Sequence, residues 1–332
     1  MIKLDYISYL KEKDLDIERH FIQKMYKPIF LDRNENLLKR FNRYKKQNYF
    51  FGLVFKKITL KKILLAKDNE LLDIITLIET RLDSLITKHQ TATEEKIKNI
   101  FRYKEKYQSA VLTPFFTDNF NFRTCFYCNK DFITNFEKNK DTYASTFQLD
   151  HFYDKRKYPY LALSFYNLIP SCSSCNSGTV KGTKDCFKYD KSIQKEAFKN
   201  ELCLAPNHTD FHFDKKVKFK LLLNNNCKNL QIKTKEDIET PLKENYSNKH
   251  EKYIEIFKLN ERYQAHKDIV YEMIRNAQLY PESRLKELQD LTGIPYQQIK
   301  KDIFNLIDED ADLSKEPFSK LIKDISQELK LI

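Results

Sequence analysis

Two pairs of cysteines constrain this chain more than any other feature of its sequence. Cys125 and Cys128 are separated by two residues, and Cys172 and Cys175 repeat that spacing further along. Two thiolates at this spacing reach one tetrahedral cation while the backbone makes a tight turn, so two pairs supply the four ligands of a closed zinc site. The total of seven cysteines is odd, which argues against a disulfide framework. The sequence therefore predicts a structural Zn²⁺ that joins the two ends of the segment between the pairs.

The charge of the chain favours a polyanionic partner. It has 59 Lys and Arg against 47 Asp and Glu, which gives a formal net charge of +12. Nucleic acid is the polyanion that basic proteins most often bind. Residues 39–62 interleave lysines and arginines with Phe and Tyr, which suits backbone contacts and base stacking. A core face with lysines on its outer side fits the same pattern equally well.

The sequence also predicts where the protein works. No segment is apolar over the length needed to cross a bilayer, and the first residues lack the apolar stretch of a signal peptide. We therefore expect a cytoplasmic protein without membrane contact. A reducing compartment would keep the paired cysteines available for metal binding.

Periodicity divides the chain into three regions. In residues 1–112 apolar residues recur at helical spacing, and we expect three or four helices that contact a partner or nucleic acid. Residues 113–192 hold the cysteine pairs among short strands and loops. In residues 193–332, alternation at 217–223 and 230–232 around an Asn-rich turn predicts a β-hairpin, and amphipathic helices follow. The expected fold class is α+β, mainly helical, with a zinc-stapled module between two helical regions.

The segment between the cysteine pairs carries a second set of polar residues. Asp150 and His151 end a β-like run, Asn167 lies shortly before the second pair, and Asn176 follows its last cysteine. With the flanking cysteine pairs, these residues resemble the HNH (ββα-metal) endonuclease superfamily, in the branch with zinc knuckles and an asparagine replacing the last histidine. The resemblance implies that Asp150-His151 ends one strand, that Asn167 lies in the next, and that Asn176 opens the helix.

The resemblance also implies a chemistry, the hydrolysis of a phosphodiester. A neutral imidazole at His151, near its ordinary pKa, would take a proton from the attacking water. Asn167 would orient this imidazole through a side-chain-to-backbone bond. Asp150 and Asn176 would bind a catalytic Mg²⁺ or Mn²⁺ through oxygen ligands. Lys181 is placed to contact phosphate, although a solvated lysine fits that position equally well.

The resemblance implies a biological role as well. Residues 259–267 and 317–320 are similar to the C-terminal part of bacterial HNH proteins from anti-phage defence loci. We therefore expect an effector that cuts DNA, with RNA and oligomerisation left open. Its activation would come from a partner such as an ATPase, a reverse transcriptase unit or a short Argonaute-like subunit. A sequence-specific restriction or homing-type HNH enzyme and a non-catalytic nucleic-acid-binding zinc protein are the alternative classes.

Overall fold

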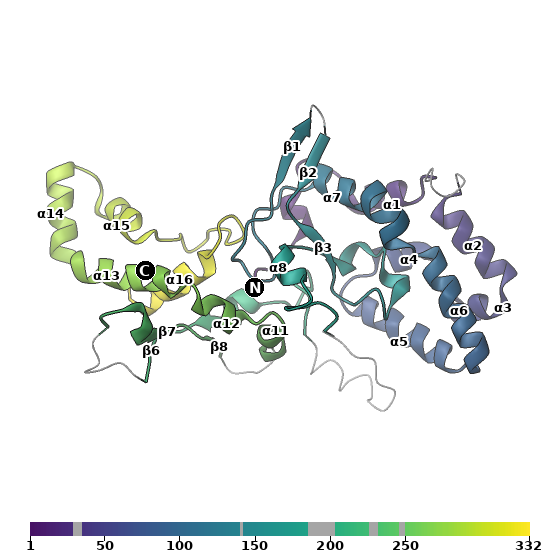
Figure 1. Ribbon diagram of the computed structural model, residues 1–332. Coiled ribbons are helices and arrows are strands. Elements are labelled where there is room, and N and C mark those ends of the chain that lie inside the picture. Colours follow the sequence, from purple (N-terminus) through teal and green to yellow (C-terminus); the bar gives the residue numbers. More distant parts are fainter. Residues whose placement is uncertain (29–34, 140–141, 185–202, 226–231, 246–249) are drawn as a thin grey trace.

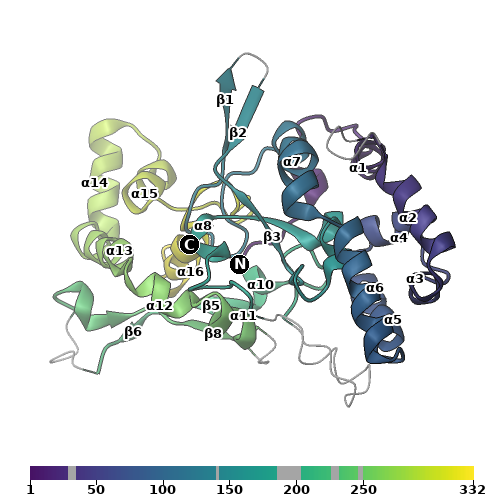
Figure 2. The same ribbon diagram turned by 45° about the vertical axis from the view of Figure 1, so that its right-hand side comes forward.

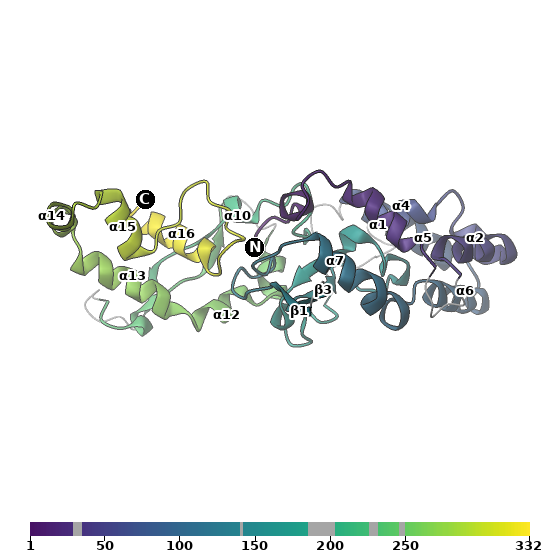
Figure 3. The same ribbon diagram turned by 90° about the horizontal axis from the view of Figure 1, so that it is seen from above.

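The computed structural model describes residues 1–332 apart from 29–34, 140–141, 185–202, 226–231 and 246–249. The chain is mainly helical with small two-stranded sheets, as the sequence predicts. It is elongated, with the first helices at one end and α14 (Glu282–Thr292) and α15 (Tyr296–Phe304) at the other (Figures 1 and 3). Among the described residues, no helix combines the length and the apolar character needed to cross a membrane.

Residues 1–112, outside 29–34, form six α-helices, more than the three or four that the periodicity predicts. The reason is local capping: the side chains of Asp16, Asn36 and Thr59 each accept a hydrogen bond from the main-chain N–H three residues further on. Such caps start new helices inside what reads as a continuous apolar pattern. The helices are α1 (Ile17–Met25), α2 (Leu37–Gln47), α3 (Tyr49–Val54), α4 (Leu60–Leu65), α5 (Asn69–Asp83) and α6 (Thr87–Ile100).

Part of the basic, aromatic stretch at residues 39–62 lies in the core, and most of its lysines are exposed. Phe41, Phe51 and Phe55 are at most 1% exposed, and their rings pack with centroids 4.5 to 5.7 Å apart. Tyr44 and Phe50 are half-buried, and Tyr49 is 78% exposed. The interpretation as a core face with lysines on the outside therefore describes most of this stretch.

The middle of the chain holds the cysteine pairs and two small sheets. A π-helical segment (Tyr103–Leu112) and α7 (Thr113–Asn119) lead into it. The hairpin of β1 (Asn135–Asn139) and β2 (Thr142–Ser145) projects from the body (Figure 2). Strand β3 (Gln148–His151) pairs antiparallel with β4 (Leu168–Ser171), so that His151 lies opposite Leu168, and the short helix α8 (Ser173–Asn176) follows.

The predicted hairpin in the last region has a different returning strand. Strand β5 (Val217–Phe219) pairs with β8 (Leu242–Glu244), and β6 (Leu222–Leu223) pairs with β7 (Ile238–Glu239). The sequence predicts that residues 230–232 form the returning strand of this hairpin. This prediction is wrong for Ile232, which lies in no strand, because the returning strand starts at Ile238. Residues 230 and 231 lie outside the described residues. A capping box between Thr234 and Asp237 forms the 3₁₀ turn η7 (Lys235–Asp237), which places buried Ile238 next in line.

The remaining helices complete one core that joins all three regions. Buried residues from the N-terminal helices, the cysteine segment and the C-terminal region belong to a single cluster, while Leu285, Ile299 and Phe304 form a small separate one at α14 and α15. The other C-terminal helices are α10 (Phe213–Lys216), α11 (Glu251–Ile256), α12 (Leu259–Gln264), α13 (Lys267–Leu279) and α16 (Ser319–Glu328).

Candidate functional site

The four paired cysteines come together in space, as their spacing predicts. Cys125, Cys128, Cys172 and Cys175 are all buried, and their Sγ atoms lie within 4.8 Å of one another. A tetrahedral Zn²⁺ with Zn–S bonds of ~2.3 Å places its sulfurs ~3.8 Å apart. The Sγ atoms of Cys128 and Cys172 are 4.0 Å apart, close to that value. The cluster therefore fits a metal ion such as zinc.

Main-chain N–H groups shape the two knuckles around the sulfurs. The N–H of Cys172 donates to Cys125 Sγ at 3.3 Å, and the N–H of Cys175 donates to Cys172 Sγ at 3.4 Å. After the first pair, Asn129 adopts a left-handed conformation with φ of 51°, and its N–H bonds to the Cys125 carbonyl at 2.7 Å. Asparagine tolerates this conformation better than most residues, which closes the turn without glycine.

Two segments distant in sequence complete the surroundings of the cluster. Arg262 on α12 donates from Nη1 to Cys175 Sγ at 3.1 Å, and its Nη2 lies 3.6 Å from Asp131 Oδ2. The amino group of Met1 donates to the carbonyls of Phe126 and Tyr127 at 2.5 and 2.9 Å. A guanidinium beside the sulfurs offsets the negative charge of thiolate ligands. Sequence reasoning missed Arg262 because nothing near it in the chain marks a metal site.

His151 is buried at the end of β3, and its contacts settle which ring nitrogen carries the hydrogen. Its Nε2 lies 2.9 Å from the carbonyl of Ala162, which can only accept, so Nε2–H is the donor. Nδ1 is then the acceptor, and it faces Lys155 Nζ at 3.4 Å. Tyr103 from the π-helical segment meets the ring edge-on at 4.4 Å between centroids. Burial and the nearby Lys155 lower the pKa of His151 well below its usual value, so the expectation of an ordinary pKa is wrong.

Asn167 holds both ends of the loop that faces His151. It lies just before β4, in the 3₁₀ turn η5 (Phe165–Asn167), rather than within the strand. Its Oδ1 accepts from the Tyr153 N–H at 2.8 Å, and its Nδ2 donates to the carbonyls of Tyr153 and Leu161, each at 3.1 Å. Leu161 precedes Ala162, the residue that binds the imidazole. Asn167 therefore makes side-chain-to-backbone bonds that fix the loop carrying the partner of His151.

The same loop is tied to the N-terminal helices. Tyr160 in the 3₁₀ turn η4 (Pro159–Leu161) donates to Glu79 Oε1 on α5 at 2.9 Å, and Ser164 donates to the Ile63 carbonyl on α4. Burial raises the pKa of Glu79 to about 7, and the Tyr160 hydroxyl opposes this change. The candidate site is thus held by helices outside the cysteine segment.

Asp150 and Lys181 form a buried ion pair, which differs from the predicted role of each. Lys181 is 1% exposed, and its Nζ lies 3.1 and 2.9 Å from the two carboxylate oxygens of Asp150. The same Nζ donates to the His151 carbonyl at 2.7 Å, and Tyr127 donates its hydroxyl hydrogen to Asp150 Oδ2 at 2.7 Å. The alternative of a solvated lysine is wrong, because Lys181 is buried. The phosphate contact of Lys181 stays a prediction. Opposite charge and hydrogen bonds compensate for the desolvation of Lys181.

Asn176 is the last residue of α8 rather than the one that opens the helix. Its Nδ2 donates to Gln148 Oε1 at 2.8 Å, at the exposed edge of β3. A divalent cation shared with Asp150 would have to displace the Lys181 ammonium and redirect this amide. As the side chains stand, Asp150 and Asn176 do not fit a shared Mg²⁺ or Mn²⁺.

A basic cavity of about 510 Å³ adjoins His151. Three of its lining residues, Tyr103, Lys155 and Ala162, are the ones that contact the imidazole. The wall is completed by the end of α6 and the start of the π-helical segment, through Lys98, Asn99, Phe101, Arg102 and Lys104, and by Pro159. None of these lining residues is acidic.

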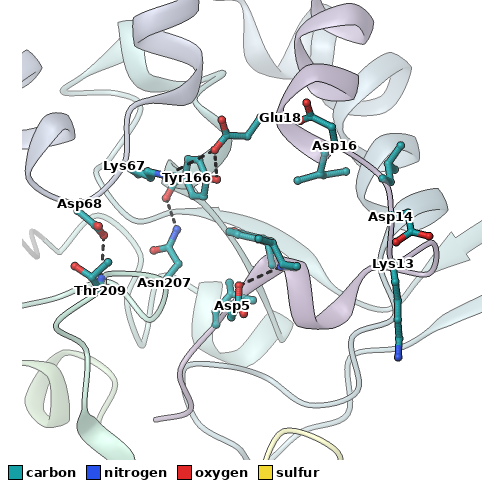
Figure 4. A pocket seen from close by; sticks show the side chains of 15 residues that line it. Asp5, Lys13, Asp14, Asp16, Glu18, Lys67, Asp68, Tyr166, Asn207 and Thr209 are labelled. Carbon is teal, nitrogen blue, oxygen red and sulfur yellow. Dashed lines mark hydrogen bonds and ion pairs between the residues drawn. The ribbon is translucent and has the colours of Figure 1, made fainter.

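A second cavity, of about 550 Å³, lies between the N-terminal segment and the loop after β3 (Figure 4). Its polar side chains serve the fold. Asp5 and Asp16 cap helices, Glu18 accepts from the Tyr166 hydroxyl at 2.6 Å, and Asp68 accepts from the Thr209 N–H at 3.0 Å. This cavity contains none of the predicted site residues.

Compared with known proteins, the chain matches no protein-family model, no curated protein and no solved structure. Its function therefore has to be argued from the geometry of its own residues.

Proposed function

We propose that this protein is an HNH-type nuclease that hydrolyses phosphodiester bonds in DNA, with His151 as the general base. The observation that carries the proposal is the fixed tautomer of His151. Its Nε2–H is committed to the Ala162 carbonyl, so Nδ1 is the basic nitrogen, next to Lys155 in the wall of a cationic cavity. Burial lowers the pKa of His151 and keeps the imidazole neutral, so Nδ1 can accept a proton from a water that attacks a bound phosphodiester.

The chemistry at this site would use the residues in their observed places. Water would lose a proton to His151 Nδ1 while its oxygen forms the new bond to phosphorus. The bond from phosphorus to the 3′ oxygen would break, and the leaving oxygen would take a proton from solvent. Lys155, 3.4 Å from Nδ1, would attract the phosphate. The four-cysteine cluster would hold the two ends of the segment that carries β3 and β4.

The role of a catalytic Mg²⁺ or Mn²⁺ stays a prediction that metal titration tests. The wider role, a defence effector activated by a partner protein, rests on the resemblance of the sequence. The rival class is a zinc protein that binds nucleic acid without cutting it. It would keep its affinity and its biological effect after loss of His151.

The test is incubation of purified zinc-loaded protein with supercoiled plasmid and with single-stranded DNA, with Mg²⁺, with Mn²⁺ and with neither, beside His151→Ala. We expect cleavage by the wild type and none by the variant, with equal zinc content and equal helical circular dichroism in both. Equal cleavage by a folded His151→Ala variant would refute the assignment of the base. Binding without cleavage by both proteins would favour the non-catalytic class.

A further inference from the structure

The cavity beside His151 is built largely from a part of the chain that lies before the cysteine pairs. Lys98 lies near the end of α6, Arg102 directly precedes the π-helical segment, Lys104 lies in its first turn, and Lys155 comes from the loop after β3. We propose that these four side chains bind the phosphates of a nucleic-acid strand, so that the N-terminal helical region supplies one wall of the substrate site. The proposal deepens the nuclease function above and rests on it.

The first support is the positive charge of the residues that line the cavity. Four cationic side chains line one cavity without an acidic side chain among its lining residues. Arg102 donates to Asn99 Oδ1 at 2.7 Å, but a neutral amide leaves the charge of the guanidinium in place. Positive side chains gathered in the lining of one cavity attract a polyanion.

The second support is the position of these cations relative to the imidazole. Lys155 lies over the Tyr103 ring with its Nζ 4.5 Å from the centroid, and that ring also packs against His151. This cation–π contact holds the ammonium at the cavity wall and leaves its charge available to an anion. A phosphate drawn to Lys155 would therefore lie next to Nδ1 of His151.

The third support is the size and composition of the cavity. Its volume of about 510 Å³ lies within the range of roughly 300–1,000 Å³ that is common for ligand sites. Lys98 and Lys104 are exposed, and Arg102 and Lys155 are half-buried, so an incoming strand can reach all four cations. Phe101 and Tyr103, on either side of Arg102, are buried and anchor the wall in the core.

The test compares two triple variants that remove the same charge. Lys98→Gln/Arg102→Gln/Lys104→Gln changes the cavity, and Lys27→Gln/Lys88→Gln/Lys286→Gln changes exposed lysines outside it. Both are made in the full-length, zinc-loaded chain carrying His151→Ala, which separates binding from cleavage. Binding of a fluorescein-labelled single-stranded oligonucleotide is measured by anisotropy over a series of salt concentrations.

Each phosphate contact contributes about 0.7 to the slope of log affinity against log salt for single strands, so three lost contacts lower the slope by about 2. At 0.15 M salt, the cavity variant should therefore bind the oligonucleotide about 50-fold more weakly than its His151→Ala parent. The control variant should stay within about 3-fold of its parent, because dispersed charges at this salt are largely screened. Inorganic phosphate at 10 mM should compete weakly if the site takes a strand rather than a free anion.

The outcomes separate this proposal from the nuclease function. Equal slopes for the two triple variants would overturn the cavity as the phosphate site, even if the wild type cuts DNA. A lower slope for the cavity variant alone, in a protein whose wild type cuts nothing, would support the binding site and refute the nuclease. Full displacement of the oligonucleotide by 10 mM phosphate would show a small-anion site and overturn the assignment to a strand.

Discussion

Asn167 offers the sharpest test of how the site is held together. The residue is fully buried, and its amide satisfies three main-chain groups: the N–H and carbonyl of Tyr153 and the carbonyl of Leu161. A buried polar group without a partner costs about 1–3 kcal/mol. Asn167→Ala removes the amide partner from the N–H and carbonyl of Tyr153, whereas the Leu161 carbonyl keeps the N–H of Ser164 at 3.1 Å. With partial relaxation of the loop, we expect the free energy of unfolding to fall by about 2–4 kcal/mol.

A control variant removes an amide of the same kind with a single bond. Asn207 donates from Nδ2 to the Tyr166 carbonyl at 2.8 Å in a half-buried position, so Asn207→Ala should cost about 1 kcal/mol. Urea unfolding of the zinc-loaded proteins, followed by circular dichroism, gives both values. Asn167→Asp is a second test variant. Its carboxylate would face two carbonyl oxygens, so it should lower the free energy of unfolding at least as much as Asn167→Ala. If Asn167→Ala lowers the free energy of unfolding no more than Asn207→Ala does, the stability of the loop does not depend on Asn167, which refutes the role assigned to its amide.

Three further predictions concern the metal cluster, the buried ion pair and the response to pH. Zinc analysis should find one Zn²⁺ per wild-type chain, none for Cys175→Ser, and one for Cys203→Ser, which changes a buried cysteine outside the cluster; retention of zinc by Cys175→Ser would contradict the assignment. Lys181→Met should lower the free energy of unfolding by about 3–5 kcal/mol because it strands the Asp150 carboxylate, and adding Asp150→Asn should restore part of it. A Lys181→Met protein as stable as wild type would exclude the buried pair. Burial raises the pKa of Glu79 from 4.5 to about 7. Protonated Glu79 therefore makes its full contribution to the free energy of unfolding below pH ~4.5, and this contribution is lost as the pH rises through 7. Relative to Glu79→Gln, the wild type should lose about 2–3 kcal/mol between pH 5 and 8.5 in urea unfolding; parallel pH profiles would show that Glu79 keeps an ordinary pKa.

The parts of this structure that could be predicted from sequence are those with local causes. The CxxC spacing places two sulfurs on one turn, and the assembled cluster confirms that inference. The β-like run that ends at Asp150 and His151 predicted a strand, and β3 covers Gln148–His151. Helical spacing identified the helical regions but missed the caps that divide the first one into six helices.

The parts that could not be predicted depend on contacts between distant segments. The pKa of His151 depends on its burial, to which Tyr103 of the preceding helical region contributes. Arg262 reaches the cluster only because α12 packs beside it. The basic, aromatic stretch at 39–62 suggested nucleic acid, yet its residues Phe41, Phe51 and Phe55 form core, while the cavity takes three of its four cations from residues 98–104. Composition alone carries no information about which lysines converge.

The alternation of side chains along β3 explains why Asp150 and His151 have separate surroundings. Neighbouring residues of a strand point to opposite faces. Asp150 faces the first knuckle, where it accepts from Tyr127 and pairs with Lys181, while His151 contacts Tyr103, Lys155 and Ala162, which line the basic cavity. Because Tyr127 lies between Cys125 and Cys128, a change at Asp150 acts on the metal cluster through the Tyr127 hydrogen bond. Loss of Asp150 should therefore disturb zinc retention as well as catalysis, whereas loss of His151 should leave the cluster intact.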